Sequence, residues 1–229
     1  MPSRRNDAIQ VNAWEFETDA QMLCALAGNS THEEVARDRI ERAQEMIRTC
    51  SISPDKVGFE IGSGTGIVAK LLSPHCAQLD CNDISESFLK IAKATCADCP
   101  NVKFHHLTGQ YLQHLPADAF DFGFSLSVFI HFNPYDIYNY LVDVRRILKP
   151  SGIFSFDACT IAAPTLSLFK ESAAIYRELP QNIRGLLNFN APRVITTIVH
   201  EANPELSDKS AIAGPGWLKC VVVRPHARR

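Results

Sequence analysis

The sequence predicts an α/β fold: a doubly wound, mostly parallel sheet of seven strands, with a C-terminal antiparallel hairpin and an N-terminal helical cap. Short apolar runs alternate with helical patterns from about residue 57 onwards, which is typical of parallel sheets. A turn that holds three glycines joins the first apolar run to a helical pattern. The chain has 229 residues, which fits one domain with an elaboration. We therefore expect residues 1–50 to form the cap and residues 51–229 to form a single globular unit.

The composition is that of a compact globular protein. Apolar residues make up 46% of the chain, charged residues 21%, and the net charge is -2, so nothing favours binding to DNA or to an anionic membrane. The longest apolar stretch, residues 120–132, is too short to span a bilayer, which takes about 20 apolar residues. The charged start does not resemble a signal peptide. We expect a cytoplasmic protein whose eight scattered cysteines are reduced thiols.

Two helices are predicted before the first strand. Two overlapping patterns, at residues 30–33 and 31–34, fit a capping box. The apolar positions after them recur at helical spacing, which predicts an amphipathic helix that ends near Cys50. A shorter helix over residues 19–26 completes the predicted cap.

The rest of the chain alternates between strands and helices. The predicted strands are short apolar runs at residues 57–61, 77–82, 102–107, 120–129, 153–157 and 217–224, with a weaker one near 205–208. The predicted helices cover residues 67–72, the stretch after Ser85, 134–148, 166–179 and 192–200. The clearest of them starts at the N-cap and N1 pair Asn133-Pro134 and ends before Lys149-Pro150-Ser151-Gly152. The weaker strand can pair with the last one across the turn at 214–216.

A glycine-rich turn and an acid at the next strand end form the main candidate site. Gly62, Gly64 and Gly66 let the backbone turn sharply after a buried strand and let a ligand approach closely. Asp83 ends the following strand, where a carboxylate can accept hydrogen bonds from both hydroxyls of a ribose. This pair predicts an adenosyl ligand. The alternative is that the three glycines only form a tight connection and that Asp83 is a charge at the start of a helix. The occurrence of the strand, the helix and the acid together disfavours this alternative.

Two details separate this turn from other nucleotide loops. The spacing is G-x-G-x-G rather than the G-x-G-x-x-G of dinucleotide folds, and no phosphate-binding G-x-x-x-x-G-K-[ST] sequence occurs. Glu60, two residues before Gly62, places an acid beside the turn. Its carboxylate can accept from the loop amides or orient the ammonium group of a ligand.

These motifs together resemble the seven-stranded, class I S-adenosylmethionine-dependent methyltransferase family. Glu60–Gly66 matches the first motif of that family and Asn82–Ser85 its acidic second motif. Phe120–Ser125 resembles the fourth-strand motif, and Ile147–Gly152 resembles the Leu-Lys-Pro-Gly-Gly stretch. The resemblance runs from about Val57 to Asp157, with a looser match at the C-terminus. It implies S-adenosyl-L-methionine as cofactor and methyl transfer as the reaction.

The resemblance also assigns roles to individual residues. Ser63 would pack with the neighbouring glycines against the methionyl and ribose parts, Asp83 would hold the ribose hydroxyls, and Ile84 would press on the adenine face. The third motif departs from the family, because Gln110 and Tyr111 occupy the region of its usual Asp. The Gln110 carbonyl can accept the adenine amino hydrogen bond. The implied cofactor-binding set is Glu60, Gly62, Ser63, Gly64, Gly66, Asp83, Ile84, Gln110, Tyr111, Ser125 and Leu126, the last two beside the transferring methyl.

His131 is the candidate general base. It follows the fourth predicted strand, where an acceptor should arrive, and a histidine of pKa near 6.5 can take a proton from an attacking hydroxyl. The alternative is that His131 caps the next helix or hydrogen-bonds inside the fold.

Cys96 and Cys99 have the spacing of a metal-ligand pair. A zinc site of this kind needs a second pair of ligands, and none stands at a suitable spacing. We therefore predict no metal and interpret the cysteines as ordinary thiols.

The acceptor is predicted from segments outside the cofactor core. The cap and residues 158–193 carry aromatic side chains and one cation that suit a small or medium-sized molecule: Trp14, Phe16, Tyr135, Phe169, Tyr176, Phe189 and Arg193. We expect methyl transfer to an oxygen or nitrogen of a secondary metabolite, a saccharide or a lipid precursor. One alternative is a methyltransferase for RNA or protein, and a second is a non-catalytic, cofactor-binding regulator.

Overall fold

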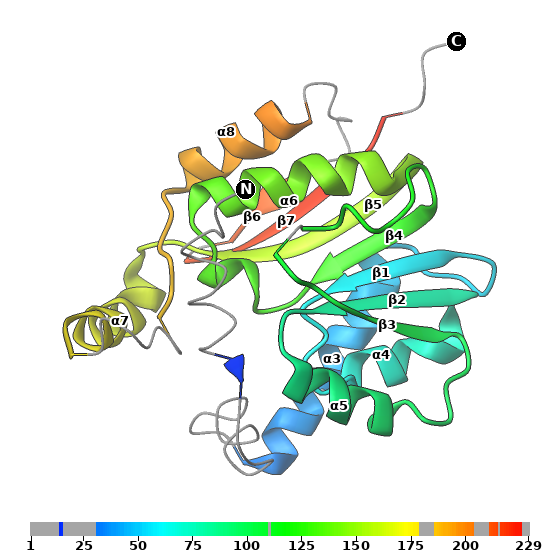
Figure 1. Cartoon of the computed structure of the whole chain (residues 1–229). Coiled ribbons are helices and arrows are strands. Elements are labelled where there is room, and N and C mark those ends of the chain that lie inside the picture. Colours follow the sequence, from blue (N-terminus) through cyan, green and yellow to red (C-terminus); the bar gives the residue numbers. More distant parts are fainter. Residues whose placement is uncertain are drawn as a thin grey trace. The chain divides into compact units, whose positions relative to one another are not determined.

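The computed structural model describes residues 14–15, 31–109, 111–178, 186–203, 211–214 and 216–225. The chain divides into two compact units, Met1–Gly109 and Gln110–Arg229. Figure 1 labels the helices and strands of both units.

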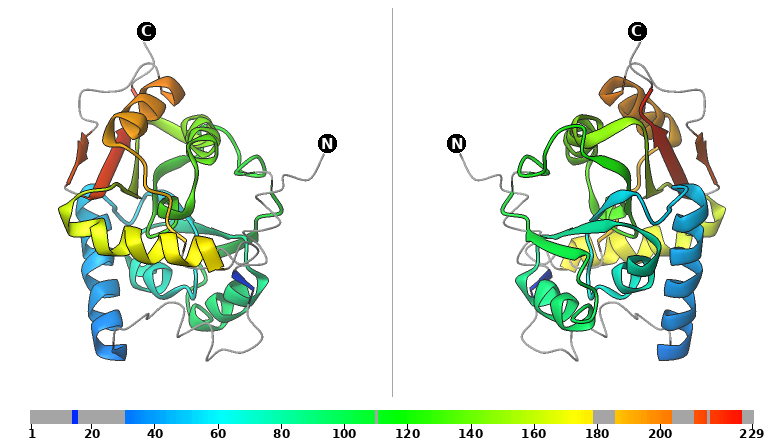
Figure 2. Two further views of the ribbon diagram at one scale, coloured as in Figure 1. Left: turned by 90° about the vertical axis from the view of Figure 1, so that its left-hand side faces the viewer. Right: turned by 90° about the vertical axis from the view of Figure 1, so that its right-hand side faces the viewer.

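The first unit is a parallel sheet with helices. Its strands lie in the order β3-β2-β1 and are all parallel, with β1 at Val57–Ile61, β2 at Gln78–Asp83 and β3 at Val102–His106. The helices are α3 (His32–Thr49), α4 (Ile67–Leu72), the short 3-10 helix η1 (Ser73–His75) and α5 (Glu86–Thr95). Figures 1 and 2 show α4 and α5 on the same face of these strands. Both β1 and β2 are almost wholly buried, as expected for strands of a parallel sheet.

Side-chain caps fix where the helices of this unit begin. Thr31 caps α3 in a capping box, because its Oγ1 accepts from the Glu34 amide at 3.2 Å while the Glu34 carboxylate accepts from the Thr31 amide at 2.8 Å. Ser85 caps α5 by accepting from the Phe88 amide at 3.1 Å. Both predicted starts are confirmed. The predicted helix over residues 19–26 lies outside the described residues.

The second unit carries the antiparallel strands. Its strands lie in the order β4-β5-β7-β6, with β4 at Phe120–Ser125, β5 at Leu148–Cys159, β7 at Trp217–Val223 and β6 at Ala211–Ala213. β4 and β5 are parallel, whereas β7 is antiparallel to both β5 and β6. The helices are η2 (Phe129–His131), α6 (Pro134–Ile147), η3 (Ala163–Thr165), α7 (Leu166–Glu178) and α8 (Pro192–Ala202). α6 packs against α8, and Figure 1 shows these two helices side by side.

Buried phenylalanines form the core of the second unit. Phe129 lies at its centre, with its ring centroid 4.6 Å from that of Phe156 and 5.9 Å from that of Phe154. All three rings are almost completely buried. This packing anchors η2 immediately after β4.

Most predicted elements are confirmed, and three predictions need correction. The fourth strand ends at Ser125 rather than at residue 129, because Ser127 turns the chain with a φ of 59°. The fifth strand extends beyond residues 153–157 at both ends, because Leu148 pairs with Phe120 of β4 and the pairing with β7 continues to Cys159. The strand beside β7 is β6, whereas residues 205–208 lie outside the described part. The α/β class and the C-terminal antiparallel pair are confirmed, and a single seven-stranded sheet with an N-terminal cap stays a prediction.

None of the helices described in either unit combines the length and the apolar character that crossing a membrane requires.

Candidate active site

The glycine turn of the first unit has the backbone that its sequence predicts. Gly62, Gly64 and Gly66 all have positive φ, at 77°, 52° and 76°, which favours glycine. They differ in what surrounds them. A Cβ on Gly66 would lie 3.0 Å from both Cα and Cβ of Ala92 on α5, whereas a Cβ on Gly64 would meet no atom within 4 Å. Gly66 therefore lets α5 pack against the turn, and Gly64 borders open space.

The Asp83 carboxylate is part of the same turn. Its Oδ2 accepts from the Gly64 amide at 2.8 Å, and its Oδ1 accepts from the Ser85 amide at 3.0 Å. Asp83 is only 6% exposed, and burial raises its pKa to about 6 although the amides of Ser85 and Gly64 oppose this rise. A carboxylate has roughly four acceptor positions, so the backbone bonds from Gly64, Ser85 and Ile84 leave capacity for a further hydroxyl donor.

The Ser63 hydroxyl is the unsatisfied polar group of the turn. Its Oγ is buried and has no hydrogen-bond partner among the residues that the structure describes. Buried polar atoms nearly always have a partner, so one without a partner calls for an explanation such as a ligand. Ser63 adjoins Gly64, so the orphaned hydroxyl and the open space belong to the same turn. The sequence alone carries no signal for this burial.

Glu60 lies beneath the turn as a buried acid. It is 2% exposed, and burial raises its pKa to about 8. Its Oε2 accepts from the Cys81 thiol at 3.5 Å on the neighbouring strand. Of the two predicted roles, accepting from the loop amides is not observed among the described hydrogen bonds, and the orientation of a cationic group stays a prediction.

The end of β4 in the second unit is held by a carboxylate that the sequence analysis missed. The Ser127 amide donates to both carboxylate oxygens of Asp157 on β5, at 2.8 and 2.9 Å. Ser127 has a φ of 59°, so Asp157 stabilises a backbone conformation that serine rarely adopts. This contact follows directly after Ser125, which is buried, and Leu126, which is half-buried.

His131 hydrogen-bonds inside the second unit. Its Nδ1 lies 2.8 Å from the Leu186 carbonyl oxygen, and because a carbonyl only accepts, Nδ1 carries the proton and Nε2 the lone pair. Burial lowers the pKa of His131, so the neutral imidazole predominates at neutral pH. Asn188 fixes the same turn, since its Nδ2 donates to the His131 carbonyl at 2.6 Å. The alternative to a role as general base was an internal hydrogen bond, and this bond is present. The same bond fixes the tautomer that a general base needs.

The third-motif residues lie at the start of the second unit. Gln110 is outside the described residues. Tyr111 is buried, and its hydroxyl accepts from Asn139 at 3.1 Å and donates to Asp136 at 3.4 Å, both on α6. Its ring makes an edge contact with Tyr140 at 4.8 Å. Tyr111 thus anchors this segment to α6.

The predicted acceptor aromatics are distributed over both units. Trp14 contacts Phe88 in the first unit, with ring centroids 6.3 Å apart, and Phe16 is outside the described residues. In the second unit Phe169 and Phe189 make an edge contact at 5.3 Å. Tyr135 and Tyr176 are 80% and 71% exposed, and Arg193 is exposed as well. Phe189 directly follows Asn188, whose side chain donates to the His131 carbonyl.

Comparison with known proteins finds similarity to methyltransferases. Residues 59–156 match the family model described as a methyltransferase domain. Geranyl diphosphate C-methyltransferase from Streptomyces coelicolor, solved with geranyl diphosphate and S-adenosyl-L-homocysteine, is similar at 10% identity and a TM-score of 0.69, over 97% of this chain and 99% of that one. Phosphoethanolamine N-methyltransferase 2 from Haemonchus contortus is similar at 14% identity and a TM-score of 0.65, over 81% and 53%. A Haloferax volcanii methyltransferase in complex with its activator Trm112 is similar at 15% identity and 0.63, over 92% and 100%.

The fold is therefore the α/β, Rossmann-like fold of class I methyltransferases, with mostly parallel strands and a C-terminal antiparallel pair. Residues 59–156 match a methyltransferase domain, and the fold of the chain is similar to that of the methyltransferases named above. The neighbouring structures include methyltransferases in complex with S-adenosyl-L-homocysteine or S-adenosyl-L-methionine.

Proposed function

We propose that this enzyme transfers the methyl group of S-adenosyl-L-methionine to an oxygen or nitrogen atom of a small molecule, such as a secondary metabolite, a saccharide or a lipid precursor. The observation that carries the cofactor half of this proposal is the turn itself. A buried, unsatisfied Ser63 hydroxyl and an open space at Gly64 adjoin a carboxylate with unused acceptor positions at Asp83. A ligand with hydroxyl and polar donor groups fits such a turn.

The residues of the first unit have separate tasks in cofactor binding. Asp83 accepts from the ribose hydroxyls, and Ile84 contacts the adenine. The Ser63 hydroxyl bonds to the methionyl or ribose part, for which Gly62 and Gly64 leave room. Glu60 favours the cationic methionyl end, because a positive charge offsets the desolvation of its carboxylate. In the second unit, Gln110, Tyr111, Ser125 and Leu126 keep the roles that the family resemblance implies.

The cofactor supplies an activated methyl group on a sulfonium, so the protein has to align an acceptor atom and exclude water. A hydroxyl acceptor needs to lose its proton during the reaction. We assign that proton to Nε2 of His131. The Leu186 carbonyl supports this role, because it holds the proton of the imidazole on Nδ1.

Two features support a small acceptor. The net charge of -2 supplies no overall field for nucleic acid. The structural neighbours include enzymes whose names specify geranyl diphosphate and phosphoethanolamine. The alternative, an RNA or protein acceptor, draws support from the neighbour that is in complex with an activator protein.

The cofactor assignment is tested with two matched variants of β2. Asp83→Ala and Asp80→Ala each remove a buried carboxylate from this strand. Asp80 accepts from His105 at 2.6 Å, and its carboxylate is not part of the turn. We expect Asp83→Ala to weaken binding of S-adenosyl-L-methionine by about tenfold to a hundredfold, and Asp80→Ala to change stability with little effect on binding. Equal affinities in calorimetric titrations of both variants would contradict the ribose role.

The acceptor assignment is tested with labelled cofactor. The purified enzyme is incubated with S-adenosyl-L-methionine carrying a labelled methyl group and a cell extract separated into small molecules, RNA and protein. We expect label in the small-molecule fraction. Label only in RNA or protein would establish the alternative, and tight cofactor binding without transfer to any fraction would indicate a non-catalytic regulator.

A further inference from the structure

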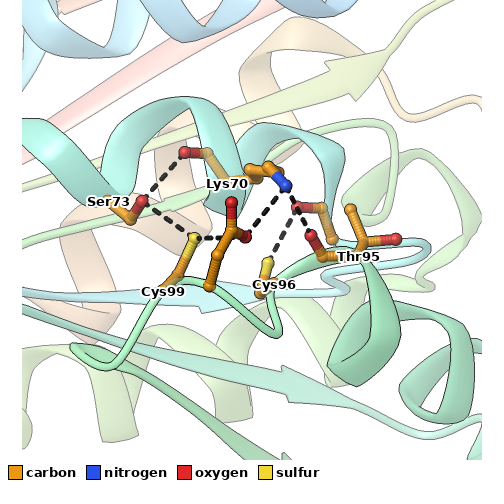
Figure 3. Close-up of polar contacts among 7 residues, drawn as sticks. Lys70, Ser73, Thr95, Cys96 and Cys99 are labelled. Atoms are coloured by element: carbon orange, nitrogen blue, oxygen red, sulfur yellow. Dashed lines mark hydrogen bonds and ion pairs between the residues drawn. The ribbon is translucent and has the colours of Figure 1, made fainter.

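A pair of cysteines lies behind the glycine turn. Cys96 follows the last residue of α5 as its C-cap, and Cys99 follows three residues later. The Cys99 amide donates to the Cys96 carbonyl at 2.9 Å, which closes a four-residue turn before β3. Among the described cysteines, Cys99 is the one that is not buried. The pair therefore has one half-buried and one buried thiol, and Figure 3 shows their polar contacts.

The buried thiol contacts the turn directly. Cys96 Sγ donates to the Gly66 carbonyl oxygen at 3.4 Å. That carbonyl also accepts from the Lys70 amide at 2.9 Å in the first turn of α4. Gly66 in turn packs closely against Ala92 of α5. A movement of Cys96 thus acts on the last glycine of the turn.

The half-buried thiol of Cys99 lies among polar and charged groups. Ser73 Oγ donates to Cys99 Sγ at 3.3 Å. Lys70 Nζ forms an ion pair with Asp98 at 2.9 Å and donates to the Thr95 carbonyl at 3.1 Å (Figure 3). Asp98, which holds Lys70, lies between the two cysteines in the sequence. The Cys99 thiol donates to the same Asp98 carboxylate at 3.6 Å. The thiolate is the reactive form of cysteine.

The turn geometry allows the two sulfurs to join. In a hydrogen-bonded four-residue turn the first and last Cα atoms lie within about 7 Å, and disulfides span Cα separations of roughly 4.4–6.8 Å. No group of three or more His, Cys, Asp or Glu side chains suited to a metal ion occurs among the described residues. The two thiols therefore form a dithiol rather than half of a described metal cluster.

We propose that Cys96 and Cys99 are a dithiol–disulfide site that reacts with small disulfides of the glutathione class, and that oxidation of this pair weakens binding of S-adenosyl-L-methionine. The second half of this statement rests on the proposed cofactor role of the glycine turn. Once joined to Cys99, the Cys96 sulfur loses its hydrogen and no longer donates to Gly66. The loss of one hydrogen bond, together with a shift of the α5 end, corresponds to a decrease in affinity of about twofold to tenfold.

The reaction balances in two exchanges. The Cys99 thiolate attacks one sulfur of the small disulfide, forms a mixed disulfide and releases one thiol after protonation. Cys96 then gives its proton to solvent and attacks the Cys99 sulfur, which releases the second small thiol. Two protein thiols are oxidised by two electrons and one small disulfide is reduced. Burial raises the pKa of Cys96 to about 12, and the charge of Cys99 adds to this rise. Cys99 therefore reacts first.

The chemical half is tested on the full chain in glutathione buffers of increasing oxidised fraction. Thiols are alkylated after quenching under denaturing conditions, and peptides are analysed by mass spectrometry. We expect an internal Cys96–Cys99 disulfide in the wild type, and a stable glutathione adduct on Cys99 in Cys96→Ser. Cys76→Ser is the matched control, because Cys76 is another buried thiol that donates to a carbonyl of α4, at 3.6 Å from Leu72. Absence of the internal disulfide in the wild type, whether Cys99 stays reduced or stops at the adduct, would overturn the proposal.

The coupling half is tested by titrating S-adenosyl-L-methionine into the reduced and oxidised protein. We expect weaker binding after oxidation in the wild type and in Cys76→Ser, and no change in Cys99→Ser or Cys99→Ala. Equal affinities of the oxidised and reduced wild type, with the disulfide formed, would refute the coupling. Failure of the reduced wild type to bind the cofactor would instead refute the proposed function, and the mass spectra would still decide the dithiol chemistry.

Discussion

The substitution Glu60→Gln tests the environment beneath the glycine turn. Glu60 is almost completely buried, and its carboxyl has a pKa of about 8 instead of the ordinary 4.5. The folded protein therefore keeps a proton that the unfolded chain releases between these two values. The contribution to stability is fully present below pH 4.5 and is lost as the pH rises towards 8. This sign is opposite to that of a salt-bridged acid.

The magnitude follows from proton linkage. Between pH 5 and pH 8 the unfolded carboxyl is largely ionised while the buried one is largely protonated. Each pH unit then lowers the free energy of unfolding of the wild type by about 1 kcal/mol, or by about 3 kcal/mol over the whole range. Glutamine has nearly the same shape, does not ionise, and can still accept from the Cys81 thiol. The free energy of unfolding of Glu60→Gln should therefore gain about 3 kcal/mol relative to the wild type over this range.

The assay is urea unfolding of both proteins at half-unit steps of pH, with fluorescence and circular dichroism as independent probes of two-state behaviour. Glu41→Gln is the control, because Glu41 is exposed in the middle of α3. We expect its stability curve to stay parallel to that of the wild type. Parallel curves for Glu60→Gln and the wild type would refute the reasoning, since they would mean that Glu60 ionises alike in both states.

Three further substitutions examine the turn, the base and the β4 exit. Gly66→Ala should destabilise the protein by about 2 kcal/mol or more, because φ is 76° and the new Cβ meets Ala92. Gly64→Ala should cost only about 1 kcal/mol of stability and should mainly weaken cofactor binding. Unfolding and cofactor titration of both variants test this, and a larger loss of stability in Gly64→Ala than in Gly66→Ala would contradict it. His131→Asn should lower kcat by roughly 10²–10⁴-fold with a hydroxyl acceptor and should remove the acid limb of the pH profile. We expect that limb below pH 6.5, because burial lowers the pKa of His131. An unchanged rate and pH profile would remove His131 from the mechanism. Asp157→Ala should destabilise the protein by about 1–3 kcal/mol, because it leaves the Ser127 amide without its acceptor. Asp157→Asn should recover part of that lost stability. Equal thermal stability of Asp157→Ala and the wild type would argue against the contact.

The glycine turn and its neighbouring acid were predictable because their signals are local. Positive φ at three alternate positions needs glycine, and an acid at a strand end is visible in the sequence. The bond from the Gly64 amide to Asp83 was not predicted, since it depends on how two parallel strands are aligned. The burial of the Ser63 hydroxyl also depends on packing and leaves no mark in the sequence.

The contacts of the second unit were harder to predict because they join distant segments. Asp157 accepts from Ser127 across 30 positions, and the Leu186 carbonyl accepts from His131 across 55. Neither partner belongs to a recognisable motif. The end of β4 was placed too late for a related reason: the apolar run continues to residue 132, and only the turn at Ser127 separates strand from η2. Apolar composition does not distinguish a buried strand from a buried helical turn.

The most direct measurement is calorimetric titration of the purified protein with S-adenosyl-L-methionine, S-adenosyl-L-homocysteine and NADH side by side. It requires no knowledge of the acceptor. We expect saturable binding of the two adenosyl sulfur ligands at one site per chain and no binding of NADH. Binding of NADH, or of none of the three ligands, would contradict the assignment of the glycine turn and Asp83 to S-adenosyl-L-methionine.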